Sequence, residues 1–168
     1  QNIRLFGGLT VWQNLWVARN STEDIQSQSI LRRWLGSSTT LKREIETMLE
    51  FSDLADKADV LASNLAFGEQ RRLELARAVA AKPQLLLLDE PAAGMNQAEV
   101  AELEQRIRSL REQGITILLV EHVMQLVMGV TDRIAVLNFG SKIAEGTPND
   151  VQENAAVQEA YLGHSDQG

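Results

Sequence analysis

Leu85-Leu86-Leu87-Leu88-Asp89-Glu90-Pro91 is the stretch of sequence that decides the fold. The four leucines follow a helical pattern that ends at Lys82-Pro83, because the residue before a proline is biased away from the helical conformation. A continuous apolar run of this length is typical of a strand that is buried on both faces of a parallel sheet. Ligand sites in open α/β sheets lie at the carboxyl ends of such strands, so the two acids stand where a site is expected.

The two acids suit different tasks, because consecutive residues at a strand end point in different directions. Asp89 could hold a magnesium ion through water, since Mg²⁺ prefers oxygen ligands and keeps part of its hydration shell. Glu90 could orient and polarise an attacking water. The alternative is an acidic helix cap or a solvated turn, which an isolated Asp-Glu pair would favour. After four leucines and before Pro91, we favour the functional interpretation.

A second buried strand follows, and polar residues again stand directly after it. Asn96 begins a capping sequence for a helix, and Gly114 ends that helix as a glycine after the last turn would. Residues 115–120 then predict another buried strand, joined to the first by a right-handed parallel crossover. His122 follows this strand and can donate a hydrogen bond to a phosphate oxygen, although a lone histidine is more often structural. The helix carries its apolar stripe at Val100, Leu103, Ile107 and Leu110.

The rest of the chain is organised around this unit. We expect a hairpin over residues 132–145, turning at Phe139-Gly140-Ser141, and a last short helix over residues 148–153. The first part is mostly helical. It comprises a capping box at Thr10–Gln13 with a helix to about Arg19, a polar linker or loose helix over 20–29, a break over 36–40, an amphipathic helix from Leu41, a short helix near 54–61 and a helix over 70–81.

A third candidate site precedes the helix at Gln70. Gly68 stands before a first turn whose backbone N–H groups form an anion site in principle. Glu69 would oppose an anion there, whereas Arg71 and Arg72 would favour it. Many helices begin with glycine, so this signal is weak by itself.

The amino acid composition limits which classes of function this chain can have. The chain has 168 residues, a formal net charge of −7 and no cysteine. The acidic balance argues against nucleic acid as a partner, and the absence of cysteine excludes a disulfide partner or a thiolate metal site. No apolar run reaches the roughly 20 residues that a membrane span needs. The chain starts at Gln1 rather than Met, within a pattern, which we interpret as a truncation.

Taken together, these segments resemble the nucleotide-binding subunits of ABC transporters. Leu65-Ala66-Phe67-Gly68-Glu69 is similar to the signature loop, usually Leu-Ser-Gly-Gly-Gln. The strand ending at Asp89 resembles the Walker B strand, and Glu90 resembles the catalytic glutamate. His122 resembles the switch histidine, and Asn96 stands in the loop that usually ends in Asp. Gln1 corresponds to the glutamine loop, which links the nucleotide site to the helical subdomain.

The resemblance implies a fold and a set of roles. The fold is α/β, a partial P-loop NTPase core with a parallel sheet and a helical subdomain, and without the phosphate-loop strand. We expect two domains, residues 1–82 and 83–168. Catalytic roles fall to Glu90, His122 and Gln1, and metal binding falls to Asp89 and Gln1. Nucleotide binding falls to the signature residues Leu65, Ala66, Phe67, Gly68 and Glu69, and to Asn96.

The implied cofactors and partners follow from the same resemblance. The intact subunit would bind ATP and Mg²⁺ and pair with a second ATPase subunit, so that each ATP lies between one subunit's phosphate loop and the other's signature. The helical subdomain would contact transmembrane permease subunits, with Trp12, Trp16 and Trp34 as candidates for that surface. Core packing is the alternative, which we favour for at least one of Trp12 and Trp16. The subunit would then lie in the cytoplasm, peripheral on the inner face of the cell membrane.

Within the family, the closest resemblance is to the ATPases of branched-chain amino acid importers. It rests on Glu90–Asn96, Val120-Glu121-His122 and Ala160–Gly163. The ATPases of lipopolysaccharide export and of urea import are alternatives. A non-catalytic interaction module that needs a complementary chain is an alternative from another class.

The sequence lacks the motif Gly-x-x-x-x-Gly-Lys-Ser/Thr, whose backbone and lysine cradle phosphates. We therefore predict that this polypeptide alone does not hydrolyse ATP. We also expect the strand before His122 to have an unpaired edge and the chain to self-associate through it. Ala66, Phe67, Asn96 and Val123 depart from the usual family residues, Ala66 by lacking a hydroxyl donor to phosphate.

Overall fold

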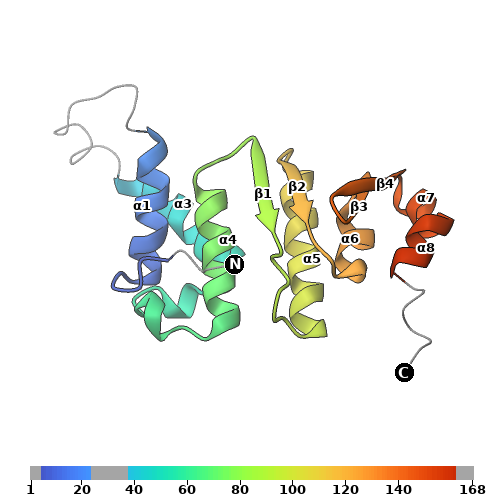
Figure 1. Cartoon of the computed structure of the whole chain (residues 1–168). Helices are drawn as coiled ribbons and strands as arrows, with labels where there is room; N and C mark the ends of the chain where they lie inside the picture. The colour runs from blue at the N-terminus through green and yellow to red at the C-terminus, as the bar shows by residue number, and fades with distance from the viewer. Residues whose placement is uncertain (1–4, 24–37, 162–168) are drawn as a thin grey trace.

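The computed structural model describes residues 5–23 and 38–161, and the side chains of residues 5–19 and 39–161. Gln1, Trp34 and most of the predicted linker lie outside the described residues. Figure 1 shows the helices α1, α3 and α4 together on the N-terminal side, followed by the strands β1 and β2 with α5. The hairpin β3–β4 and the helices α7 and α8 form the C-terminal end.

The helical part is built from α1 (Val11–Glu23), α3 (Ser38–Phe51) and α4 (Phe67–Ala80). The predicted capping box begins α1: Thr10 N–H donates to Gln13 Oε1 over 2.9 Å, and Gln13 N–H donates to Thr10 Oγ1 over 3.2 Å. The three helices enclose one apolar core. It contains Val11, Leu15, Ile45, Leu49, Leu54, Ala62, Leu65, Leu73 and Ala76.

Three predicted boundaries in this part are wrong. α1 runs to Glu23, four residues beyond Arg19, so residues 20–23 are helical, as the loose-helix alternative predicted. α3 begins at Ser38, so residues 38–40 of the predicted break are helical. Both errors concern terminal turns, where some backbone groups have no intrahelical partner and polar side chains are tolerated. α4 begins at Phe67 rather than Gln70, because Glu69 reaches back to the N–H of Ala66 over 3.0 Å and fixes an earlier start.

The short helix predicted near residues 54–61 is confirmed only in part, as a 3₁₀ helix over Ala55–Lys57. Two 3₁₀ turns, Ala55–Lys57 and Ala62–Asn64, occupy the segment between α3 and α4. The carbonyl of Val60 accepts the N–H of Val11 over 3.0 Å, and the carbonyl of Ala58 accepts the N–H of Trp12 over 2.9 Å. These carbonyls satisfy the first turn of α1, so they are unavailable for a local helix.

The sheet core confirms the central prediction. β1 (Leu85–Asp89) and β2 (Thr116–Val120) pair in parallel, from Leu85 opposite Thr116 to Asp89 opposite Val120. The helix α5 (Gln97–Glu112) connects them. It ends at Gly114, whose φ of +87° suits glycine, with Ile115 N–H donating to the Leu110 carbonyl over 3.2 Å. The predicted stripe of α5 is buried, at Val100, Leu103, Ile107 and Leu110.

The strands are not buried on both faces, contrary to the prediction. Leu86 is 5% exposed and packs among the buried residues of α5 and α6 (Met124–Val130). Leu85 and Leu87, which point to the other face, are 54% and 65% exposed, and Leu118 and Val120 of β2 are 59% and 57% exposed. Within residues 5–23 and 38–161, helices cover only one face of this pair of strands, so alternate side chains remain accessible.

The C-terminal part contains the predicted hairpin. β3 (Ile134–Asn138) pairs antiparallel with β4 (Ser141–Gly146) across Phe139 and Gly140, whose φ angles are +46° and +77°. The predicted last helix is α7 (Pro148–Gln152), but α8 (Ala155–Tyr161) follows it. α6 was not predicted either. Both missed helices have seven residues, which is too short for a clear periodic pattern.

The observed architecture is α/β, a parallel pair of strands with covering helices and a helical part, as expected. Among the helices described here, none is both long and apolar enough to cross a membrane. The division into two domains near residue 82 stays a prediction.

Candidate functional site

The carboxyl ends of β1 and β2 lie side by side, because the parallel register places Asp89 opposite Val120. The next backbone bond continues this pairing, as Glu90 N–H donates to the Val120 carbonyl over 2.8 Å. Glu90 has a φ of +45°, a left-handed conformation that is uncommon outside glycine. Asp53, Lys82 and Phe139 have positive φ angles as well, so this conformation does not by itself distinguish Glu90.

Glu90 and His122 are brought together by this register. His122 Nδ1 lies 3.6 Å from Glu90 Oε1, and the side chains are 66% and 32% exposed. The distance is too long for a hydrogen bond, so the contact is an electrostatic one that strengthens when the imidazole is protonated. Both groups remain accessible to a substrate that approaches the strand ends.

Glu121 is a site residue that sequence reasoning did not single out. Its side chain is 0% exposed, although His122 beside it is largely accessible. Its carboxylate accepts three backbone N–H groups: Ala92 over 2.9 Å, His122 over 2.7 Å and Val123 over 3.2 Å. A polar residue after an apolar strand was the only available signal, because the link to Ala92 spans 29 positions.

Asp89 is exposed at the end of β1. The part of the chain described here holds no group of three or more His, Cys, Asp or Glu residues that could bind a metal. A single carboxylate nevertheless fits Mg²⁺, which takes one or two protein carboxylates and completes its shell with water and substrate phosphates. Among the described residues, Asp89 is therefore the one that would hold the ion. Gln1, the other predicted ligand, lies outside the described residues.

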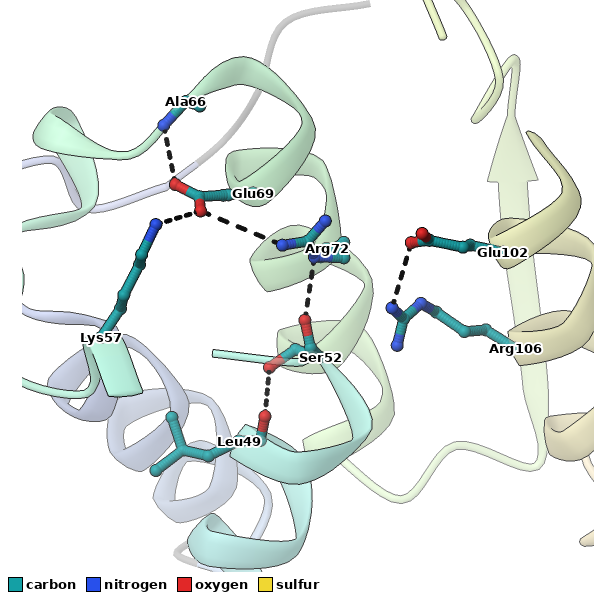
Figure 2. Close-up of polar contacts among 8 residues, drawn as sticks. All are labelled: Leu49, Ser52, Lys57, Ala66, Glu69, Arg72, Glu102 and Arg106. Atoms are coloured by element: carbon teal, nitrogen blue, oxygen red, sulfur yellow. Dashed lines mark hydrogen bonds and ion pairs between the residues drawn. The ribbon is translucent and has the colours of Figure 1, made fainter. Parts of the chain in front are cut away.

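The signature segment lies at the start of α4. Leu65 is buried in the helical core, whereas Ala66 and Phe67 are exposed. Figure 2 shows Glu69 turned back toward Ala66 and Lys57, with Lys57 donating to Glu69 Oε1. This bond to Lys57 is the main reason that the pKa of Glu69 is lowered and the pKa of Lys57 is raised. The acid that would oppose an anion is thus paired with a cation.

A second cation lies close to the same acid. Arg72 NH2 is 4.0 Å from Glu69 Oε1, and Arg72 Nε donates to the Ser52 carbonyl over 3.0 Å (Figure 2). Ser52 is buried, and its hydroxyl donates to the Leu49 carbonyl over 3.1 Å at the end of α3. The signature helix is therefore tied through one chain of bonds to the helix that precedes it.

The predicted signature and the predicted loop after β1 contact each other. A Cβ built on Gly68 would lie 2.7 Å from Glu99 Oε1, and a Cβ on Gly94 would lie 3.5 Å from the Phe67 ring. Asn96 itself caps α5, accepting Ala98 N–H over 2.9 Å and Glu99 N–H over 3.1 Å. In Figure 1 the arrow of β1 points toward the end of the molecule at which α4 begins. The signature segment and the loop after β1 are therefore neighbours.

The comparisons with known proteins agree with this geometry. Residues 1–93 match the ABC transporter family, and residues 141–167 match the family described as branched-chain amino acid ATP-binding cassette transporter. The chain is 44% identical over 172 residues to the high-affinity branched-chain amino acid transport ATP-binding protein LivG of Salmonella typhimurium. It is 43% identical over 173 residues to LivG of Escherichia coli. In both cases the alignment covers 98% of this chain but only 66% of the relative.

A more distant relative is the lipopolysaccharide export system ATP-binding protein LptB of Haemophilus influenzae. It is 31% identical over 163 residues, which cover 97% of this chain and 63% of LptB.

Solved structures of ATP-binding cassettes have the same fold. The ADP conformation of MJ1267, an ATP-binding cassette of an ABC transporter, matches with a TM-score of 0.71 and 26% identity, over 94% of this chain and 64% of that one. A nucleotide-free cassette from an ABC transporter matches with a TM-score of 0.69 and 27% identity, over 92% of this chain and 63% of that one. The chain belongs to the ATP-binding cassette family of ABC transporters, and within it resembles the ATP-binding proteins of branched-chain amino acid transport.

Proposed function

We propose that this chain provides the signature and the catalytic strand ends of an ATPase subunit that powers branched-chain amino acid import through a membrane permease. The observation that carries the proposal is the approach of His122 Nδ1 to Glu90 Oε1, 3.6 Å apart at the carboxyl ends of two paired parallel strands. The identity to LivG proteins, at 43–44%, against 31% to LptB, supports the amino acid importer over lipopolysaccharide export.

Each strand-end residue has a task in this proposal. Asp89 would hold Mg²⁺, and the ion would neutralise phosphate charge there. Glu90 orients the attacking water, and its half-buried carboxylate is still accessible for that purpose. His122 donates a hydrogen bond to a phosphate oxygen. Gln1, which lies outside the described residues, contributes to catalysis and metal binding in this proposal.

The signature acts on a second nucleotide. Leu65–Glu69 at the start of α4 faces the ATP that another subunit holds, and the N-terminal dipole of α4 favours the phosphates. Glu99 accepts the N–H of Asn96 and also lies against Gly68 of this segment. Asn96 is therefore close to the signature and supports nucleotide binding. The functional unit is then a homo- or heterodimer of ATPase subunits on permease subunits at the inner face of the membrane. Trp16, which is 41% exposed on α1, is a candidate for the permease contact.

The 168-residue polypeptide by itself does not hydrolyse ATP in this proposal, because its sequence contains no phosphate-binding loop. Lipopolysaccharide export is the second candidate, favoured by the similarity to LptB. Urea import and a non-catalytic module that joins a complementary chain are less well supported, since no observation of this fold favours either.

A chimera tests the transported substrate. This chain replaces the matching 66% of Escherichia coli LivG, and uptake of radiolabelled leucine is measured in cells that lack LivG. We expect uptake to be restored and to be lost again in Glu90→Gln. A chimera that is produced and hydrolyses ATP without restoring leucine uptake would contradict the amino acid substrate.

A further inference from the structure

We propose that Glu121 is a positioning residue: its buried carboxylate holds the loop after β1 and the loop after β2 together, and thereby fixes Glu90 relative to His122. The inference rests on the proposed function for the roles of Glu90 and His122, and on the observed contacts for the rest.

The burial and contacts of Glu121 are unusual for a surface loop. Its side chain is 0% exposed, and a buried carboxylate is costly unless its charge is compensated by hydrogen bonds. Three backbone N–H groups supply that compensation, at 2.7, 2.9 and 3.2 Å. Hydrogen bonds to an ionised acceptor are stronger than neutral ones, so the carboxylate is a firm anchor for all three groups.

The three donors come from two different loops. His122 and Val123 directly follow Glu121 and precede α6, so bonds to them alone would amount to an ordinary local cap. Ala92 belongs to the loop after β1, two residues beyond Glu90. One oxygen, Oε1, binds Ala92, and the other, Oε2, binds the two local N–H groups. The carboxylate therefore bridges the loops that carry the two proposed catalytic side chains.

The same carboxylate also faces the imidazole. His122 Nδ1 lies 3.4 Å from Glu121 Oε2 and 3.6 Å from Glu90 Oε1, so both nearby acids are on the Nδ1 side of the ring. Both contacts are electrostatic and neither is a hydrogen bond, so Nε2 can carry the proton that His122 donates to a phosphate in the proposed function.

Two substitutions of Glu121 distinguish its bond to Ala92, which bridges the two loops, from its local bonds to His122 and Val123. Glu121→Gln keeps the shape of the side chain but presents an NH₂ group to backbone donors, so at least one bond is lost. Glu121→Asp is shorter by one methylene, which preserves reach to His122 and Val123 but not to Ala92. Asp150→Asn is the matched control, because Asp150 Oδ2 accepts the N–H of Thr147 over 2.8 Å as a purely local cap.

The test begins with amide hydrogen exchange by NMR on this 168-residue chain. We expect the Ala92 amide to exchange about 10-fold faster or more in Glu121→Asp, and unchanged in Asp150→Asn. In Glu121→Asp the Val123 amide keeps its protection, whereas in Glu121→Gln either the Ala92 amide or the two local amides exchange faster, depending on which donors the remaining oxygen accepts. Unchanged exchange at Ala92 in folded Glu121→Asp would overturn the proposal, whether or not the chain belongs to an active ATPase.

The second readout uses the LivG chimera described above. We expect Glu121→Asp to lower kcat for ATP about 10- to 100-fold with KM within about 2-fold, because misplacement of reacting groups affects the chemical step more than binding. A KM that rises with kcat unchanged would refute the positioning role. If the unsubstituted chimera has no activity, the proposed function fails. The hydrogen exchange result still decides whether Glu121 joins the two loops.

Discussion

Replacement of Asn96 by alanine should destabilise the sheet core through the start of α5. Asn96 Oδ1 accepts two backbone N–H groups, at 2.9 and 3.1 Å, and Glu99 Oε2 accepts the N–H of Asn96 over 2.8 Å. Loss of such a cap lowers the free energy of unfolding by about 1–2 kcal/mol. With an m-value of about 2 kcal/mol/M in urea, the unfolding midpoint falls by about 0.5–1 M.

Asn96→Asp is the matched control, because aspartate accepts the same two N–H groups and adds a negative charge at the positive end of the helix dipole. The dipole favours it by about 0.3–1 kcal/mol, although repulsion from Glu99 offsets part of that gain. The assay is urea unfolding followed by circular dichroism, with equal m-values for all three proteins. A midpoint of Asn96→Ala within about 0.2 M of the unsubstituted chain would refute the capping argument.

Three further predictions concern charge, nucleotide and association. Lys57 lowers the pKa of Glu69 from the usual 4.5, so their pairing stabilises the fold above that pH and is lost as the pH falls through the pKa of Glu69 in the folded state. Lys57→Met should therefore reduce the fall in urea unfolding midpoint that acid causes. An unchanged fall would contradict this. Calorimetry should detect no Mg-ATP binding to the 168-residue chain at millimolar nucleotide, whereas tight binding that depends on Asp89 would refute the requirement for a phosphate loop. Light scattering should show self-association that Leu118→Lys reduces, since Leu118 is 59% exposed on β2, the strand expected to have an unpaired edge; a monomer at all concentrations would count against it.

The elements with strong local signals could be predicted from the sequence. Four leucines marked β1, the capping side chain of Asn96 marked the start of α5, and Gly114 marked its end. The parallel register then brought Glu90 and His122 to adjacent strand ends, as the strand–helix–strand order implied. These features depend on residues near one another in the chain, which is where sequence patterns are informative.

The features that the sequence did not predict depend on tertiary contacts or on short elements. Glu121 reaches Ala92 across 29 positions, and Lys57 reaches Glu69 across 12, so neither pairing leaves a local pattern. The exposure of Leu87 depends on which faces of the strands are covered, whereas an apolar run alone indicates burial. α6 and α8 are two turns each, too short to show a helical stripe.

The rate of Mg-ATP hydrolysis by the LivG chimera, with and without Glu90→Gln, tests the catalytic assignment most directly. Glu153→Gln is the control, since Glu153 is exposed after α7 and away from the strand ends. We predict that Glu90→Gln lowers kcat by about 100- to 10,000-fold while ATP binding persists, and that Glu153→Gln has no effect. A Glu90→Gln chimera that hydrolyses ATP at the unsubstituted rate would contradict the assignment of catalysis to the end of β1.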